Sequence, residues 1–66
     1  MITIDELTDD INDFGEVTDI SEQAANRKFI EGVHGVLKEG GIWGWPDADK
    51  VYRKKGEGFE LVVEGP

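Results

Sequence analysis

The hydrophobic pattern of this chain changes once, near Gly40-Gly41, and that change is the strongest constraint on its fold. Before this point apolar residues recur at spacings of three and four, which is the period of an amphipathic helix. After it come short apolar runs separated by turn residues, which is typical of strands. We therefore expect an α+β fold. Two N-terminal helices, at about residues 3–14 and 20–39, should pack on a C-terminal three-stranded antiparallel meander.

The chain has 66 residues and no cysteine, so it has room for one small domain, residues 1–66, and no disulfide to support it. A domain of this size buries only about 60% of the surface that its unfolded chain exposes. Small domains often gain stability from self-association, so a homodimer stays open. The single histidine, His34, cannot form a metal site alone. We expect neither a metal nor a cofactor.

The first expected helix has both a start signal and a stop signal. Thr3 followed by Glu6 predicts a capping box, and Gly15 predicts a stop at the C-terminal end. Four residues at helical spacing form the apolar stripe: Ile4, Leu7, Ile11 and Phe14. The acids lie on the opposite side of the helix, where pairs four residues apart repel one another.

The second expected helix begins at a cap formed by Asp19 or Ser21 and ends before Gly40-Gly41. One broad arc is apolar and should be buried: Ala25, Phe29, Ile30, Val33, Val36 and Leu37. The other arc is polar and should face solvent: Arg27, Glu31, His34 and Lys38. Gly32 flanks the apolar arc, where we expect it to allow close approach of the first helix.

The expected strands are residues 42–45, 51–55 and 59–64. The last two flank Gly56-Glu57-Gly58, which predicts a hairpin. Pro46 to Asp49 carries turn residues and should join the first two strands. A short helix over residues 47–54, which would leave fewer strands, is the alternative.

The charge is distributed unevenly along the chain. Residues 1–26 hold eight acids and no base, whereas residues 27–66 hold seven acids and seven bases, so the net charge of −8 belongs to the first part. A surface of one sign attracts partners of the other sign and speeds their encounter. The sequence thus predicts an acidic helical part, residues 1–26, and a charge-neutral helix and sheet part, residues 27–66.

This asymmetry favours a non-catalytic regulator, such as an inhibitor or modulator of a larger host protein with a basic patch. Small acidic proteins of this composition occur among the accessory proteins of viruses and mobile elements. The tryptophans pack in the core or provide an apolar anchor for the partner. The expected partner-binding residues are Asp5, Glu6, Asp9, Asp10, Asp13, Glu16, Trp43 and Trp45.

Several other interpretations of the same features stay open. The acidic face could serve solubility alone, or imitate the phosphates of DNA. Another class of function is a single-stranded nucleic-acid-binding module, in which bases stack on aromatic side chains beside a basic cluster. Its residues would be Trp43, Trp45, Tyr52, Arg53, Lys54 and Lys55. A structural subunit of a larger assembly is a third class.

The sequence contains no phosphate loop, nucleophile motif or dinucleotide fingerprint, so we expect no enzymatic activity. No stretch has the length and apolarity of a secretory signal or a transmembrane helix. We therefore expect no membrane partner and a cytoplasmic location, which would be the host cytosol if the gene is viral.

Overall fold

The computed structural model describes residues 1–45 and 50–64, without the side chains of Trp45, Val63 and Glu64. Two helices, α1 (Ile4–Phe14) and α2 (Ile20–Val36), precede three strands, β1 (Ile42–Trp45), β2 (Lys50–Lys55) and β3 (Gly58–Glu64). The strands form one antiparallel sheet in the order β1-β2-β3. The expected α+β layout is confirmed.

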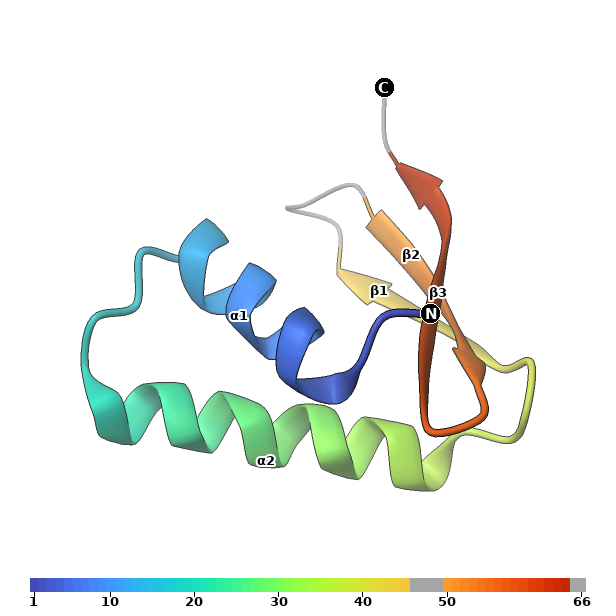
Figure 1. Ribbon diagram of the computed structural model, residues 1–66, viewed down its shortest axis with the longest axis horizontal. Helices are drawn as coiled ribbons and strands as arrows, with labels where there is room; N and C mark the ends of the chain where they lie inside the picture. The colour runs from blue at the N-terminus through green and yellow to red at the C-terminus, as the bar shows by residue number, and fades with distance from the viewer. Residues whose placement is uncertain (46–49, 65–66) are drawn as a thin grey trace.

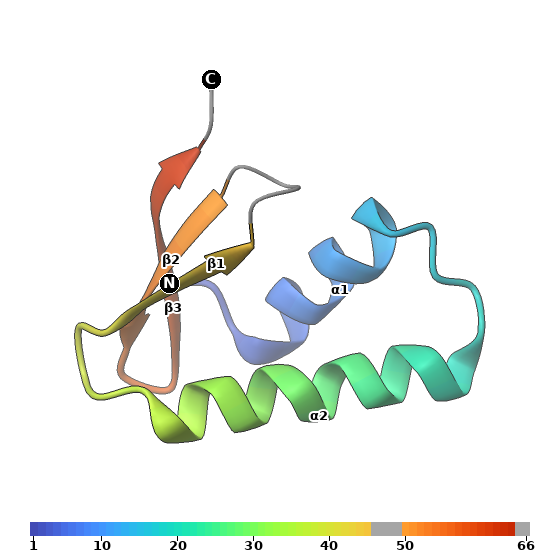
Figure 2. The same ribbon diagram turned by 180° about the vertical axis from the view of Figure 1, so that it is seen from behind.

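The two helices run antiparallel to each other, and the sheet stands beside the C-terminal end of α2 (Figure 1). From behind, α2 again forms the base, with α1 lying along it and β1 facing both helices (Figure 2). The molecule measures 32 × 28 × 17 Å. The C-terminal half of α2 therefore meets the sheet, and its N-terminal half meets α1.

Helix α1 begins as the sequence predicts. The Thr3 hydroxyl accepts from the backbone N–H of Glu6, and the Glu6 carboxylate accepts from the backbone N–H of Thr3. Its buried side chains are Leu7, Thr8 and Asn12. Phe14 was predicted to belong to the apolar stripe that packs on the protein. This prediction is wrong, because its side chain is 58% exposed. The buried side of α1 is turned toward Thr8 and Asn12, because α2 packs there.

Helix α2 begins at Asp19, whose carboxylate accepts from the backbone N–H groups of Ser21 and Glu22 and from the Ser21 hydroxyl. The hydrogen bond from the Ser21 hydroxyl, followed by the two backbone hydrogen bonds, lowers the pKa of Asp19. The cap therefore stabilises the fold at neutral pH, and this contribution is lost as the pH falls through the lowered pKa.

The expected end of α2 near Glu39 is wrong, since the helix stops at Val36. Leu37 is already extended, and Gly40 has a φ of 82° in a turn closed by the Gly41 N–H and the Lys38 carbonyl. Gly40 is therefore left-handed, as the sequence predicts. It lies in the turn of residues 38–41, which follows the helix, and not at the helix end itself.

The buried face of α2 differs from the predicted arc. Ile30 is buried and Val33 and Leu37 are half-buried, whereas Ala25, Phe29 and Val36 are exposed. The predicted role of Gly32 is also wrong, because no atom lies within 4 Å of the Cβ that it lacks. The reason is that α1 contacts α2 from the side of Asn26 and Arg27 instead.

The β2–β3 hairpin follows the prediction. Lys55 pairs with Gly58 across a two-residue turn, and Gly56 has a φ of 57°. This is the position at which a type II′ turn places glycine. The alternative helix over 47–54 is wrong where it overlaps β2, because residues 50–54 are strand. The predicted turn at Pro46 to Asp49 lies outside the described residues.

The N-terminal segment extends the sheet by one residue beyond β3. Ile2 and Phe59 exchange two backbone hydrogen bonds of 2.7 Å each. Gly58 permits this approach, because a Cβ there would collide with the carbonyl oxygen of Ile2. The bridge holds the start of α1 against the outer edge of β3.

The core is small and draws on every helix and strand. Its fully buried side chains are Leu7, Ile30, Tyr52 and Phe59. Five half-buried residues pack around them: Ile2, Ile4, Ile11, Leu37 and Trp43. The rings of Tyr52 and Phe59 meet edge to face at 6.4 Å. With so few buried residues, each one carries a large share of the stability.

A polar junction attaches the hairpin to the C-terminal end of α2. The Lys54 ammonium donates to the carbonyl oxygens of His34 and Leu37, both at 2.8 Å. The His34 Nε2–H donates to the Gly56 carbonyl, and the Glu39 carboxylate accepts from the Gly56 N–H. The prediction of His34 as a surface residue is wrong. It is half-buried, with its ring edge-on to Phe59 at 5.3 Å.

Candidate protein-binding surface

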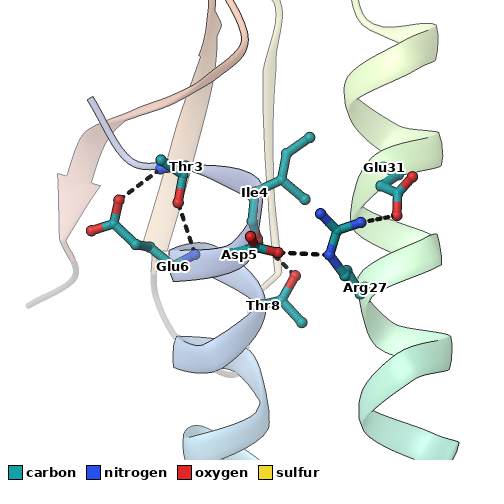
Figure 3. Close-up of polar contacts among 7 residues, drawn as sticks. All are labelled: Thr3, Ile4, Asp5, Glu6, Thr8, Arg27 and Glu31. Atoms are coloured by element: carbon teal, nitrogen blue, oxygen red, sulfur yellow. Dashed lines mark hydrogen bonds and ion pairs between the residues drawn. The ribbon is translucent and has the colours of Figure 1, made fainter.

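The acids predicted to bind a partner divide into two groups. Asp5 and Glu6, in the first turn of α1, are engaged inside the protein (Figure 3). Glu6 closes the capping box, and Asp5 points toward α2. Both are exposed, but part of their hydrogen-bonding capacity is used within the protein.

Asp5 belongs to an ion-pair network between the helices. Its Oδ1 lies 2.6 Å from the Nε of Arg27, whose Nη1 also contacts Glu31 on the next turn of α2. The hydrogen bond to Asp5, assisted by the charge of Glu31, raises the pKa of Arg27 above its usual value. Arg27 thus contacts two carboxylates and pairs with Asp5 across the two helices.

The remaining four acids form what we call the acidic patch: Asp9, Asp10, Asp13 and Glu16. All four are exposed. Within residues 1–45 and 50–64, no lysine or arginine lies at ion-pair distance from any of them. Asp9 and Asp13 stand four residues apart and repel each other. The patch is therefore unneutralised negative charge, held at some cost to α1.

Glu16 occupies a strained backbone position at the end of this patch. The Glu16 N–H donates to the Asp13 carbonyl and the Val17 N–H to the Asn12 carbonyl, which is the Schellman pattern. That motif requires a left-handed residue, and it is Glu16, with a φ of 52°. The prediction of Gly15 as the stop of this helix is confirmed, because Gly15 is the C-cap; its φ is −84°, and the left-handed residue follows it.

Replacing Glu16 with glycine should stabilise the protein. A left-handed non-glycine residue costs about 1–2 kcal/mol, part of which is offset by the greater freedom of glycine in the unfolded chain. We expect Glu16→Gly to raise the free energy of unfolding by about 0.5–1 kcal/mol, measured by thermal denaturation. Glu16→Gln removes the same charge but keeps the strain. A glycine variant no more stable than the glutamine variant would contradict this account.

Trp43 is half-buried and lies between the core and an open cavity. Its ring stacks on Tyr52 at 6.5 Å and meets Phe29 at 6.0 Å, so one side packs on the core. Trp43 also borders an open cavity of about 380 Å³ between α1, α2 and β1. The cavity is lined by Ile11, Asn26, Phe29, Ile30, Trp43 and Gly44.

Phe29 is a surface residue that the sequence reasoning assigned to the core. Its side chain is 60% exposed at the rim of this cavity. The helical period of α2 alone could not reveal this, because it does not say which side α1 covers. Trp45 pairs with Lys50 through its backbone, and its side chain lies outside the described residues.

Most of the described residues of the nucleic-acid alternative are engaged inside the protein. Tyr52 is 1% exposed, and Lys54 is held at the end of α2. Arg53 and Lys55 contact Glu60, and the hydrogen bond from Arg53, followed by the charge of Lys55, lowers the pKa of Glu60. The aromatic and basic groups that would have to bind bases and phosphates together are thus engaged separately.

In the part of the chain that the structure describes, no helix is long and apolar enough to cross a membrane. The described residues include no group of three histidine, cysteine or acidic side chains arranged to hold a metal ion. In comparisons with known proteins, no family model, curated protein or solved structure matches this chain.

Proposed function

We propose that this protein is a non-catalytic regulator that binds a larger protein through the acidic patch of α1. The observation that carries the proposal is the set of four exposed carboxylates that form no ion pair with any lysine or arginine of the described residues. The partner would present lysine and arginine residues to this patch. Binding would cover the partner's basic surface and thereby inhibit or modulate the partner.

The backbone strain at Glu16 supports the same proposal. A non-glycine residue in the left-handed region costs stability and persists where the surrounding structure or a function requires it. Here it coincides with repulsion between Asp9 and Asp13, so two independent costs fall on one surface. A surface that served solubility alone would need neither of them.

Affinity needs apolar contact as well as charge, because exposed ion pairs contribute only about 0–1 kcal/mol each. The exposed part of Phe29 and the cavity beside Trp43 are suitable for an apolar side chain of the partner. In this proposal the acids speed the encounter and select a basic partner. The proposal keeps the cytoplasmic location expected from the sequence.

The test compares two variants with the same net charge. In the first, Asp9, Asp10 and Asp13 are changed to Asn and Glu16 to Gln. The control neutralises four acids elsewhere in the chain: Glu22→Gln, Asp47→Asn, Asp49→Asn and Glu57→Gln. Both lose four negative charges, so only their location differs. Circular dichroism checks that both fold.

Partners captured by the wild-type protein at low salt are identified, and their affinity is then measured for each variant by calorimetry. We expect the patch variant to bind about 10–100-fold more weakly and to lose most of the salt dependence. The control should stay within about threefold of wild type. Equal binding by the two variants would exclude the acidic patch as the docking surface.

A further inference from the structure

Strand β1 is an edge of the sheet, and its outer side pairs with no other strand of the described chain. The sheet order β1-β2-β3 leaves β1 paired with β2 alone. The outer side of β3, by contrast, is bonded to Ile2 at Phe59. In Figure 2, β1 lies on the side of the sheet away from β3. One edge of the sheet is therefore open.

The backbone groups on this edge belong to Ile42 and Gly44. The Lys54 N–H donates to the Gly41 carbonyl, so these two residues form a bonded pair of the antiparallel ladder. Bonded and non-bonded pairs alternate along such a ladder. The register of β1 and β2 therefore turns the N–H and C=O groups of Ile42 and Gly44 away from β2, and both residues are exposed. Two donors and two acceptors, about 7 Å apart along the strand, are open to another extended backbone.

Strand β1 also lacks the charges that usually protect a sheet edge. Its sequence is Ile-Trp-Gly-Trp, whereas β2 and β3 both carry charged residues. Natural proteins discourage pairing at an edge strand with lysine, other charges or proline. β1 is short but has none of these residues, and the Ile42 side chain is 62% exposed. The open edge is thus the uncharged strand of the sheet.

We propose that β1 binds an extended segment of the partner as an added antiparallel strand. This inference rests on the proposed function, because it specifies how the same partner reaches the cavity beside Trp43. Main-chain hydrogen bonds to an open sheet edge recognise a chain in the extended conformation, which presents its own groups at the same spacing. The antiparallel direction is that of the sheet and is the more stable pairing.

The cavity determines which side chain the segment presents. In this register the two neighbours of a central residue bond to Ile42 and Gly44, and the central residue lies opposite Trp43. Side chains of opposite residues stand on the same face of a sheet. The central side chain therefore points, with that of Trp43, toward the cavity that Trp43 and Gly44 line. The lining is apolar apart from Asn26, so the central residue should be apolar.

Charge favours a basic segment over an acidic one. Asp10 of the acidic patch directly precedes Ile11, which lines the cavity. Residues two positions from the central one stand on the same face of the added strand. A lysine or arginine at these positions is attracted by the patch, whereas an acid is repelled. The expected segment is therefore an extended chain with an apolar residue between two bases.

The probe is the capped peptide Thr-Lys-Thr-Leu-Thr-Lys-Thr, in which leucine is the central residue. Nuclear magnetic resonance should show shifts of the Ile42 and Gly44 amide signals, with a dissociation constant of about 1 mM. No shift of these signals at about 5 mM peptide would overturn the proposal. Shifts that depend on the concentration of the protein alone would also overturn it, because a second copy would then occupy the edge.

Methylation of the peptide nitrogens separates strand pairing from side-chain contact. In the proposed register, the N–H groups of the two threonines beside leucine point to β1, and the leucine N–H points away. Methylating both threonine nitrogens should weaken binding about tenfold or more, and methylating the leucine nitrogen should change it less than about threefold. Equal effects, or the reverse order, would refute the added antiparallel strand.

Ile42→Pro tests the same bond from the side of the protein. The Ile42 N–H points outward, so proline removes a donor from the edge but no bond from the sheet. Ile42→Ala is the matched control, because it loses the exposed side chain and keeps the N–H. Proline should weaken peptide binding about tenfold, and alanine less than about threefold. Equal binding by the two variants would contradict the proposal. If Ile42→Pro does not fold, the methylated peptides decide.

The patch variant, in which Asp9, Asp10, Asp13 and Glu16 are neutralised, distinguishes the two proposals. If it binds the peptide as wild type does, with the same effect of methylation, the acidic patch is excluded and the added strand stands without its charge selection. If it binds more weakly and the position of methylation has no effect, the patch stands and the added strand is refuted.

Discussion

Replacing Phe59 with alanine is expected to remove most of the stability of this protein. Phe59 is 0% exposed, contacts the rings of Tyr52 and His34, and is bonded through its backbone to Ile2. Deleting a buried phenylalanine side chain costs about 3–5 kcal/mol. A domain of this length has a total stability of about 3–10 kcal/mol. We therefore expect Phe59→Ala to unfold at a much lower urea concentration than wild type, as measured by far-ultraviolet circular dichroism.

Phe29→Ala is the matched control, because it deletes the same atoms from a side chain that is 60% exposed. Its expected loss is below about 1 kcal/mol, measured by the same urea denaturation. The comparison separates burial from residue type. Similar losses in the two variants would contradict the core described here.

The second large effect is expected for Lys54→Met. The Lys54 ammonium donates to the carbonyl oxygens of His34, in the last turn of α2, and Leu37, its C-cap, and thereby joins the helix end to the hairpin. Methionine retains the apolar stem but leaves both carbonyls without this donor. Hydrogen bonds from charged groups contribute about 1.5–3 kcal/mol, and a cation at a helix C-terminus adds to them. We expect a loss of about 1.5–3 kcal/mol in chemical denaturation.

Lys55→Met provides the comparison, because the two lysines are neighbours in the same strand. Lys55 is exposed, and its ammonium lies 3.5 Å from the Glu60 carboxylate. An exposed pair of this kind contributes less than about 1 kcal/mol. Hydrogen exchange should also show faster opening at the end of α2 for Lys54→Met alone. Equal destabilisation by the two substitutions would exclude the proposed role of Lys54.

Part of the candidate site could be predicted from the sequence. The acids of α1 were expected on one side of a helix, and Asp9, Asp10 and Asp13 are indeed exposed there. The sequence could not show that Asp5 would be paired, because its partner Arg27 lies 22 residues away on another helix. Nor could it show the strain at Glu16, since the choice between Gly15 and Glu16 depends on where the last turn of α1 closes.

The features that the sequence determined by itself are those held by short-range interactions. The capping box of Thr3 and Glu6, the Asp19 cap and the Gly56 turn each involve residues at most three positions apart or a single backbone angle. Such bonds depend little on the rest of the fold, so local chemistry predicts them.

Only the tertiary structure decided which residues of each type are buried. Phe29 is exposed and Phe59 is buried, although both stand in apolar patterns, and Lys54 is half-buried while its neighbour Lys55 is exposed. The physical reason is that burial depends on which element covers a surface. A chain of 66 residues has too few elements to cover them all. Helical period shows that a stripe is apolar, and packing decides whether anything lies against it.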